Sequence, residues 1–164
     1  SNLENVLDLG TGSGCIAIEI SKIFESATIF GSDICEKALK VAKKNNHQSN
    51  NRVNFIKSNW FSDIEGQFDL IVSNPPYIPE GTKLEASTLF EPKVALFSEG
   101  TGLEDLKKII SEAISYLKIN GALILEHGIG QSSELSSYMK KIGYKNIGTL
   151  NDLKDINRFV YGYK

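Results

Sequence analysis

The sequence has few of the residues that mark metal-binding, secreted and membrane proteins. Its 164 residues include two cysteines, two histidines, one tryptophan and one methionine. Cys15 and Cys35 lie far from any histidine pair, so no zinc site is predicted, and a domain of this size does not need a disulfide. No apolar run reaches about 18 residues, and the first residues do not resemble a signal peptide. We therefore expect a cytoplasmic protein that holds no metal and does not associate with a membrane.

An excess of positive charge is also missing. Eighteen lysines and arginines face 20 acidic residues, which gives a formal charge of −2 and a pI near 5.7. Proteins whose affinity comes from phosphate contacts usually carry a strongly basic face, so a nucleic-acid partner is disfavoured. With 41% hydrophobic residues the chain can bury the core of one domain. We expect a single, monomeric domain over residues 1–164 that is part of a longer protein.

Apolar runs of strand length alternate with helical patterns along the chain. The runs are Val6–Leu9, Ala27–Phe30, Val53–Ile56, Phe68–Val72 and Ala122–Leu125, and residues 157–163 alternate like a terminal strand of an antiparallel hairpin. Such alternation predicts an α/β fold with a doubly wound, mostly parallel sheet, whose ligand site lies beyond the carboxyl ends of the strands. Four groups of residues have helical spacing: Ile16, Ile20, Ile23 and Phe24; Ala38, Leu39 and Ala42; Leu106, Ile109, Ile110, Ala113, Ile114 and Leu117; and Leu135, Tyr138, Met139 and Ile142.

A glycine-rich loop follows the first strand and opens a helix. Glycines let a backbone approach a ligand without interference from Cβ, and a helix N-terminus offers free N–H groups to a carboxylate. The spacing G-x-G-x-G, rather than G-x-G-x-x-G, favours a nucleoside with an amino-acid tail over a pyrophosphate. The residues of this motif are Asp8, Leu9, Gly10, Thr11, Gly12, Ser13 and Gly14.

Asp33 supports the same interpretation. It lies nineteen residues beyond Gly14, at the end of the second strand, where a carboxylate can accept hydrogen bonds from both ribose hydroxyls. The two features together predict a site for a nucleoside cofactor. The alternative is that the glycines only form a tight turn and that Asp33 caps the next helix.

The segment Asn74-Pro75-Pro76-Tyr77 directly follows the strand that ends near Val72. It resembles the N/D-P-P-Y/F box of methyltransferases that modify planar, amide-like nitrogens. Such a nitrogen carries two N–H donors and a lone pair delocalised into its π-system, so two fixed acceptors can orient it. The Asn74 side-chain oxygen and the Pro75 carbonyl would be these acceptors, the prolines would stiffen the loop, and Tyr77 would cover the flat face of the substrate. The alternative is a rigid turn followed by a packed tyrosine.

Over almost its whole length, the chain resembles the release-factor glutamine methyltransferases, the PrmC/HemK family. The resemblance implies a Rossmann-like class I methyltransferase fold, with a mostly parallel seven-stranded sheet and an antiparallel C-terminal hairpin. Family members also carry an N-terminal helical domain that helps to grip the release factor, and this domain is absent from the chain. The matching segments are residues 6–14, 58–61, 71–78, 91–97, 100–103 and 158–160.

The resemblance also implies a reaction. A methyl group passes from S-adenosylmethionine to the side-chain nitrogen of the glutamine in the Gly-Gly-Gln motif of peptide chain release factors, and S-adenosylhomocysteine is the other product. By the same resemblance Asn74 and Pro75 orient the glutamine, and Tyr77 packs against it. Trp60 is placed beside the adenine, although it could instead fill the core beside Phe61. The implied cofactor contacts are Asp8, Gly10, Thr11, Gly12, Ser13, Gly14, Asp33, Trp60 and Asn74.

Two regions are less informative. The stretch from Pro79 to Gly102 lacks periodicity and is long for a loop, so we expect a functional insertion, in which Glu91 and Lys93 have no assigned role. His127 stands where the family has an apolar residue. A lone histidine there is expected to be packed or exposed rather than catalytic.

Other targets remain open at this point. A close relative of the family methylates a glutamine of a ribosomal protein with the same box. An adenine amine of DNA or RNA presents the same donors, but it requires base flipping and a basic face around the pocket. A non-catalytic scaffold is a further alternative, which the intact Asp33, Asn74 and Tyr77 disfavour.

Overall fold

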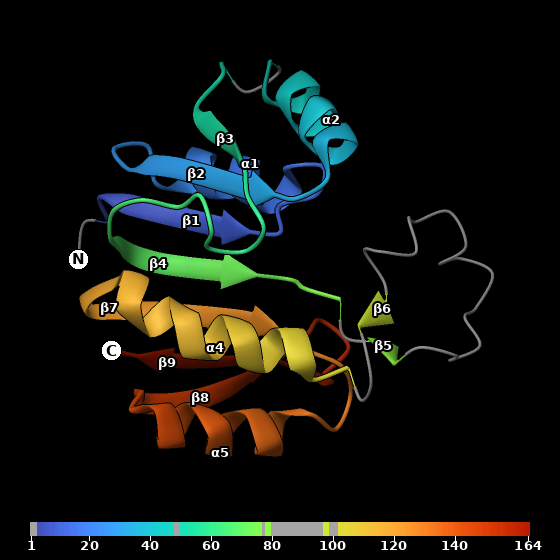
Figure 1. The fold of residues 1–164 in the computed structure, drawn as a ribbon, viewed down its shortest axis with the longest axis vertical. Coiled ribbons are helices and arrows are strands. Elements are labelled where there is room, and N and C mark those ends of the chain that lie inside the picture. The colour runs from blue at the N-terminus through green and yellow to red at the C-terminus, as the bar shows by residue number, and fades with distance from the viewer. Residues whose placement is uncertain (1–2, 48–49, 77, 80–96, 99–101) are drawn as a thin grey trace.

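The computed structural model describes residues 3–47, 50–76, 78–79, 97–98 and 102–164. A seven-stranded mixed sheet in the order β3-β2-β1-β4-β7-β9-β8 forms the centre of the molecule (Figure 1). Its first five strands in this order are parallel, and β9 runs antiparallel to both of its neighbours. The strand bounds are β1 Asn5–Leu9, β2 Thr28–Asp33, β3 Val53–Lys57, β4 Phe68–Ser73, β7 Leu117–Glu126, β8 Lys145–Asn151 and β9 Asn157–Tyr163.

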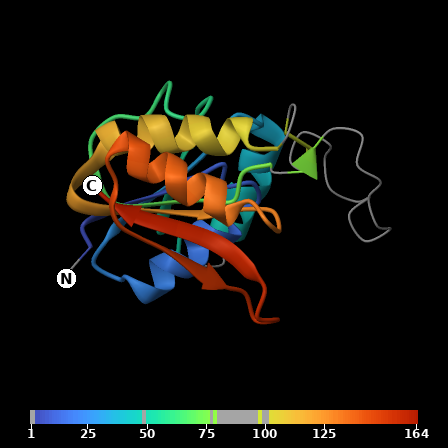
Figure 2. The same ribbon diagram turned by 90° about the horizontal axis from the view of Figure 1, so that it is seen from below.

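Helices cover both faces of the sheet. Helices α4 and α5 lie together on one face, and α1 lies on the other (Figure 2). Helix α2 packs against α1 and against β2 and β3. This arrangement confirms the predicted doubly wound α/β fold with an antiparallel C-terminal hairpin. The helix bounds are α1 Cys15–Ile23, α2 Glu36–His47, α4 Glu104–Tyr116 and α5 Ser132–Ile142.

The larger hydrophobic core lies between the sheet and the pair α4 and α5. Because side chains alternate along a strand, Leu7 and Leu9 of β1 and Leu123 and Leu125 of β7 enter this core from the same face of the sheet. The helical spacing predicted for α4 and α5 is confirmed, except that Leu117 begins β7 instead of ending α4. Fully buried members of the core are Leu7, Leu9, Ile71, Leu106, Ile109, Ile110, Ala113, Leu117, Leu123, Leu125, Leu135, Met139 and Val160.

The predicted buried face of α1 is confirmed for Ile20 and Phe24 and wrong for Ile16 and Ile23. Ile16 and Ile23 are 39% and 70% exposed, whereas Ala17, Ile18 and Ser21 are buried. The hydrogen bond that the Ala17 N–H donates to a buried carboxylate of β1 turns this side of the helix toward the sheet. A small residue at position 17 also allows α1 to approach the strands closely. Ile20 and Phe24 are partly buried against the smaller core on this face.

The strand order reverses between β1 and β4. The chain passes from β1 to β2 and β3 on one side, and then returns to place β4 on the other side of β1. Ligands of open α/β sheets bind beyond the carboxyl ends of the strands at such a point. The short parallel strands β5 (Ile78–Pro79) and β6 (Phe97–Ser98) also lie at this end (Figure 1). The rest of the predicted insertion, including Glu91 and Lys93, is outside the described residues.

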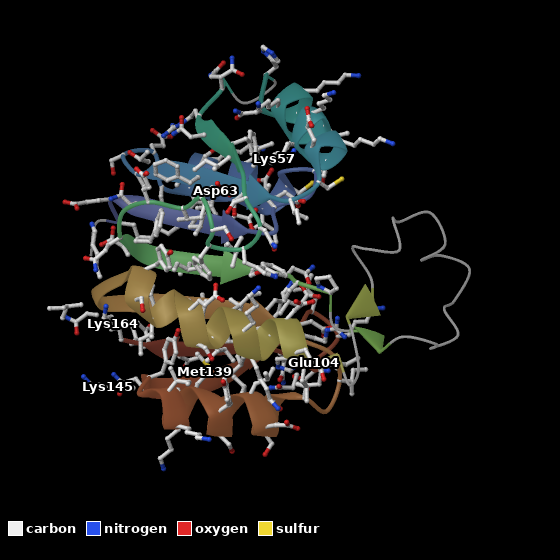
Figure 3. All side chains as sticks on the ribbon, in the orientation of Figure 1. Lys57, Asp63, Glu104, Met139, Lys145 and Lys164 are labelled. Atoms are coloured by element: carbon white, nitrogen blue, oxygen red, sulfur yellow. The ribbon has the colours of Figure 1, made fainter. Side chains whose placement is uncertain are left out.

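The two ends of the sheet are easily told apart in Figure 3. Glu104, at the start of α4, lies at the end where the parallel strands terminate. Lys145 and Lys164 lie at the opposite end. The motifs predicted to carry function follow β1, β2, β3 and β4, so they belong to the end marked by Glu104.

Candidate functional site: a glycine loop beside an Asn-Pro-Pro turn

The glycine loop, residues 10–14, links β1 to α1 and needs its glycines for different reasons. Gly10, Gly12 and Gly14 have positive φ angles of 73°, 56° and 83°, which side chains with a Cβ rarely adopt. A Cβ on Gly12 would meet nothing within 4 Å, so the middle of the loop is open. A Cβ on Gly14 would lie 3.0 Å from both Ala42 and Phe55. The loop therefore combines an exposed backbone with tight packing against α2.

Asp8 lies beneath this loop and is 1% exposed. Its Oδ2 accepts hydrogen bonds from the Thr11 hydroxyl at 2.6 Å and from the Ala17 N–H at 3.1 Å. Its Oδ1 has no hydrogen-bond partner among the described residues. Burial raises the pKa of Asp8 to about 6, the two hydrogen bonds oppose this rise, and the charge of Asp33 adds to it. The carboxylate thus fastens both the loop and the start of α1 to β1.

Asp33 joins the glycine loop to the end of β2. Its Oδ2 accepts a hydrogen bond from the Gly12 N–H at 2.8 Å, and its Oδ1 accepts one from the Cys35 N–H at 2.8 Å. The Thr11 N–H donates to the Ser32 carbonyl at 2.8 Å. Asp33 is half-buried at the rim of the loop. It organises the turn before α2, as the structural alternative predicts, and a role toward a ribose stays a prediction.

Trp60 reaches the glycine loop from the segment after β3. A Cβ on Gly10 would lie 3.5 Å from the Trp60 ring, so the indole rests against the loop backbone. Trp60 has a positive φ of 51°, and the Ser58 hydroxyl stabilises this turn by donating to the Trp60 carbonyl at 2.8 Å. The ring is partly buried and also packs on the larger core. The core packing that the sequence allowed for Trp60 is thus observed, and its position beside an adenine stays a prediction.

Asn74, Pro75 and Pro76 follow β4 next to the loop. The Ser73 hydroxyl donates to the Leu9 carbonyl at 2.5 Å and joins the ends of β4 and β1. Asn74 is exposed, Pro75 is buried and Pro76 is half-buried. The structure thus anchors the turn through Pro75 and leaves the asparagine amide accessible at the same edge as the glycine loop.

Two further site residues contribute less to this geometry. Tyr77 lies outside the described residues, so its predicted contact with a substrate stays a prediction. Ser13 is exposed, and its hydroxyl lies 3.3 Å from the Cys15 thiol at the start of α1. It faces the open side of the loop rather than the core.

The sequence patterns did not identify Ser73 and Glu126 as residues of this edge, and they left open whether His127 is buried or exposed. Ser73 connects the glycine loop to the Asn-Pro-Pro turn, yet it reads as an ordinary strand residue. Glu126, at the end of β7, forms an ion pair with Arg158 of β9 at 3.1 Å. His127 is fully buried, and its Nδ1 lies 2.8 Å from the Gly128 carbonyl. Cross-strand pairing, which a single sequence does not reveal, would have been needed to find the ion pair.

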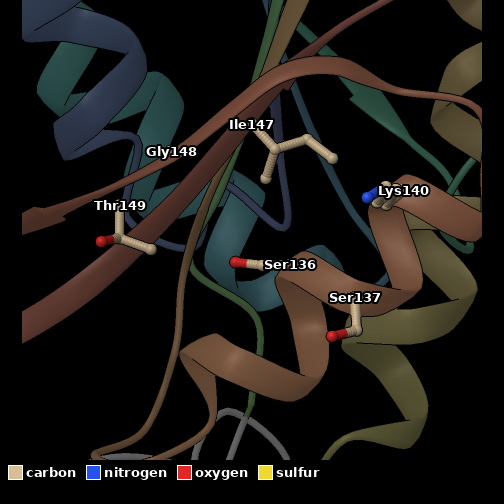
Figure 4. Close-up of a pocket in the computed structure, with 6 residues that line it drawn as sticks. All are labelled: Ser136, Ser137, Lys140, Ile147, Gly148 and Thr149. Atoms are coloured by element: carbon tan, nitrogen blue, oxygen red, sulfur yellow. The ribbon is translucent and has the colours of Figure 1, made fainter.

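A surface groove lies elsewhere on the described part of the molecule. It has a volume of about 430 Å³ and lies between α5 and the edge strand β8 (Figure 4). None of the predicted site residues lines it, so it does not support the cofactor prediction. Among the residues that the structure describes, no cluster of three metal-ligating side chains occurs and no helix is long and apolar enough to cross a membrane. The groove is lined by Ser136, Ser137, Lys140, Ile147, Gly148 and Thr149.

Solved structures with the same fold are methyltransferases of diverse kinds. A methyltransferase from Pyrococcus furiosus superposes with a TM-score of 0.77 at 21% identity, covering 98% of this chain and 75% of that one. The catalytic domain of human Mettl16, solved with an RNA hairpin, also gives 0.77, at 16% identity over 98% of this chain and 64% of that one. At these identities the likeness concerns the fold alone. It confirms the predicted class I methyltransferase architecture.

Sequence relatives are closer but longer. A release factor glutamine methyltransferase of Buchnera aphidicola (subspecies Schizaphis graminum) is 40% identical over 99% of this chain and 60% of its own length. A bifunctional methyltransferase of Rickettsia typhi is 43% identical over 95% of this chain and 31% of its own length. The chain thus spans less than two thirds of either relative. Residues 1–142 match the family described as the methyltransferase small domain. The chain therefore belongs to the methyltransferase small domain family.

Proposed function

We propose that the protein transfers a methyl group from S-adenosylmethionine to the side-chain amide nitrogen of the glutamine in the Gly-Gly-Gln motif of a peptide chain release factor. The observation that carries this proposal is the position of Asn74. This exposed amide follows β4 directly and lies at the same edge as the glycine loop, because Ser73 and Leu9 are hydrogen-bonded. A methyl donor on the loop and an amide held by the turn would therefore be neighbours.

The glycine loop fits an amino-acid-linked nucleoside. Gly12 leaves room for a ligand, and the first N–H groups of α1 can receive a carboxylate. Asp33 at the loop rim and Trp60 against Gly10 would hold the ribose and the adenine. Asp8, Gly10, Thr11, Ser13 and Gly14 would complete the site. The bound cofactor supplies a sulfonium methyl group that is reactive toward nucleophiles.

The protein's own task is then to orient a weak nucleophile. An amide nitrogen is weakly nucleophilic because its lone pair is delocalised. The Asn74 Oδ1 and the Pro75 carbonyl would each accept one of its N–H groups, which fixes the nitrogen and increases its electron density. Pro75 is buried and Pro76 is half-buried, so these acceptors start from a restrained backbone. In this proposal Tyr77 covers the planar face of the glutamine.

The choice of a release factor rests on the relatives. Three of them, from Buchnera and Haemophilus influenzae, are 37–40% identical and are named release factor glutamine methyltransferases. The formal charge of −2 disfavours a nucleic-acid substrate. We also propose that the protein acts in the cytoplasm as a monomer. Segments that the longer relatives carry beyond the aligned region would help to grip the release factor.

A labelling experiment tests this function. The natural full-length protein is incubated with labelled S-adenosylmethionine, a release factor, ribosomal proteins and structured RNA and DNA, and the label is located by mass spectrometry. We expect label on the glutamine of Gly-Gly-Gln and a loss of roughly 100-fold in rate for Asn74→Ala, the size found when one oriented hydrogen bond at a reacting group is removed. Asn54→Ala, which changes an exposed asparagine of β3, is the matched control and should keep the wild-type rate.

Each other result has a definite meaning. Label on a ribosomal-protein glutamine would retain the chemistry and change the partner. Label on adenine would show that the same turn serves a flipped base. No transfer to any of these substrates, with S-adenosylmethionine still bound, would favour a non-catalytic binding module.

A further inference from the structure

Positive charge is concentrated on α2 and β3. Residues 36–57 hold six of the 18 lysines and arginines but only one of the 20 acidic residues. The other 142 residues hold 12 basic and 19 acidic side chains, so a segment of formal charge +5 belongs to a chain whose remainder carries −7. The charge of −2 for the whole chain averages over this difference. The exposed lysines of the segment are termed the basic face: Lys37, Lys40, Lys43 and Lys44 of α2 and Lys57 of β3.

Helical geometry gathers the four lysines of α2 on one side of the helix. At 3.6 residues per turn, positions 37, 40, 43 and 44 fall within an arc of about 120°. The opposite side, with Leu39, Ala42 and Asn46, is buried. Lys57 lies beside α2 (Figure 3). Like charges three or four residues apart disfavour a helix, so this cluster is unfavourable unless an anion lies against it.

The basic face has little compensation of its own. Lys40 and Lys57 share one carboxylate, Glu36, at Nζ–Oε distances of 3.9 and 3.6 Å. Three lysines elsewhere on the molecule hold a carboxylate at 2.5–2.7 Å. The other three lysines of the basic face form no ion pair with any residue that the structure describes. Their ammonium groups are therefore available to an external anion.

A hollow of about 200 Å³ lies within the basic face, between α2 and β3. Three of its six lining residues are lysines, so an anionic group that enters it can be approached by three ammonium groups at once. The Phe55 ring separates it from the glycine loop, since a Cβ on Gly14 would lie 3.0 Å from that ring. The lining residues are Glu36, Leu39, Lys40, Lys43, Phe55 and Lys57.

The chemistry of the basic face fits a phosphodiester backbone better than a protein or a membrane. The cores of protein interfaces are depleted in lysine and enriched in arginine. The only arginine of residues 36–57, Arg52, already donates a hydrogen bond to the Glu25 carbonyl. Insertion into a membrane needs the apolar side of a helix, but that side of α2 is buried in the fold. Lysines that each meet one phosphate hold a nucleic acid without reading its sequence.

We propose that the basic face binds the phosphate backbone of RNA, with one phosphate in the hollow. Asn74 follows β4, three strand spacings or about 14 Å from β3, so RNA on this face would leave the Asn-Pro-Pro turn open. RNA is then a docking partner and not the group that is methylated. The choice of RNA over DNA rests on the proposed function, because an enzyme that modifies a release factor meets RNA during translation. The phosphate contacts themselves do not depend on that function.

Fluorescence anisotropy of the natural full-length protein with a labelled RNA hairpin of about 20 base pairs tests the contact, from about 50 mM salt upward. In the face variant we expect Kd to rise at least about tenfold and the slope of log K against log salt to become shallower by about 2, because each lost phosphate contact releases roughly one counterion fewer. Lys43→Gln alone, at the hollow, should make the slope shallower by about 1. The control variant removes the same charge far from the basic face and should change Kd by less than about twofold. The face variant combines Lys37→Gln, Lys40→Gln and Lys44→Gln, and the control variant combines Lys108→Gln, Lys141→Gln and Lys145→Gln, all at exposed positions.

Three results would overturn the inference. Equal weakening by the face and control variants would mean that only net charge matters. Tighter binding of polyglutamate or of phosphatidylserine vesicles than of the hairpin would assign the face to an acidic protein or to a membrane. A DNA duplex of the same length that binds more tightly than the hairpin would exclude RNA as the occupant.

Release-factor methylation without RNA separates this inference from the proposed function. The face variant should keep the wild-type rate, since none of its substitutions lies in the predicted site. A protein that binds RNA through the basic face but does not methylate a release factor would refute the proposed function alone. A protein that methylates the release factor but binds no RNA would refute the docking surface alone.

Discussion

The two faces of the sheet are packed very differently. Toward α4 and α5, the strand residues Leu7, Ile71, Leu123, Leu125 and Val160 are all 0% exposed. Their neighbours on the other face, Val72, Ile124 and Tyr161, are only partly buried. Helices α1 and α2 lie mainly over β1, β2 and β3. The same strands β4, β7 and β9 thus have one sealed face and one that the described helices cover less.

The two faces of these strands therefore have different roles, one in stability and one in presenting polar groups. Asn74, which follows β4, is exposed, and Glu126, the last residue of β7, is half-buried, whereas Leu125 beside it on the sealed face is fully buried. A polar group can approach a ligand only where the packing leaves it accessible. The sealed face therefore holds the strands in register, and the other face presents polar groups at their carboxyl ends.

The largest expected effect compares neighbouring residues of β7. Leu125→Ala should lower the free energy of unfolding by about 3 kcal/mol, because it leaves a cavity in a closely packed core. Ile124→Ala, one residue earlier on the other face, should cost about 1 kcal/mol, since its side chain is only partly buried. Urea unfolding of the 164-residue chain measures both values. Equal losses would mean that the two faces are packed alike.

The second prediction concerns the buried carboxyl group of Asp8, on the face of β1 that α1 covers. The pKa of Asp8 is raised from 3.8 to about 6, so the folded protein binds this proton more tightly than the unfolded chain. Its contribution to stability is fully present below about pH 4 and is lost as the pH rises to about 6. Asp8→Asn should therefore gain up to about 3 kcal/mol relative to wild type between pH 4 and pH 7, the free energy of a shift of roughly two pKa units. Urea unfolding across this range should show no such change for the exposed control Asp63→Asn, and a flat difference for Asp8→Asn would contradict a raised pKa.

Much of the sealed face could be predicted from the sequence. The apolar runs of β1, β3 and β4 lie within one residue of the observed strands, and the stripes Leu106–Ala113 and Leu135–Met139 are the buried sides of α4 and α5. The prediction for α1 was wrong for Ile16 and Ile23, because hydrophobicity alone favoured them over Ala17 and Ser21. The small Ala17 allows the close approach, and the Asp8 carboxylate fixes the helix orientation.

The site was predictable to the extent that it is local in sequence. The glycine loop, Asp33, Trp60 and Asn74 each belong to a motif or follow a strand end, and the structure brings them to one edge. Ser73 and Glu126 act through partners 64 and 32 residues away, Leu9 and Arg158. Such partners depend on strand order and register, which periodicity does not specify.

The smallest effect tests how each face tolerates added volume. In Gly162→Ala the new Cβ would lie 3.0 Å from Met139 and 3.1 Å from Tyr144, on the sealed face, and we expect a loss of about 1–2 kcal/mol. In Gly148→Ala it would meet the Tyr161 ring, with the Cζ at 2.5 Å. This contact is closer, yet the ring lies on the less covered face and can turn away, so stability should stay within about 0.5 kcal/mol of wild type. In a Tyr161→Ala background, Gly148→Ala should become stabilising, because alanine restricts the unfolded chain more than glycine. Urea unfolding distinguishes these cases, and a larger loss for Gly148→Ala than for Gly162→Ala would mean that Tyr161 is held as firmly as the core.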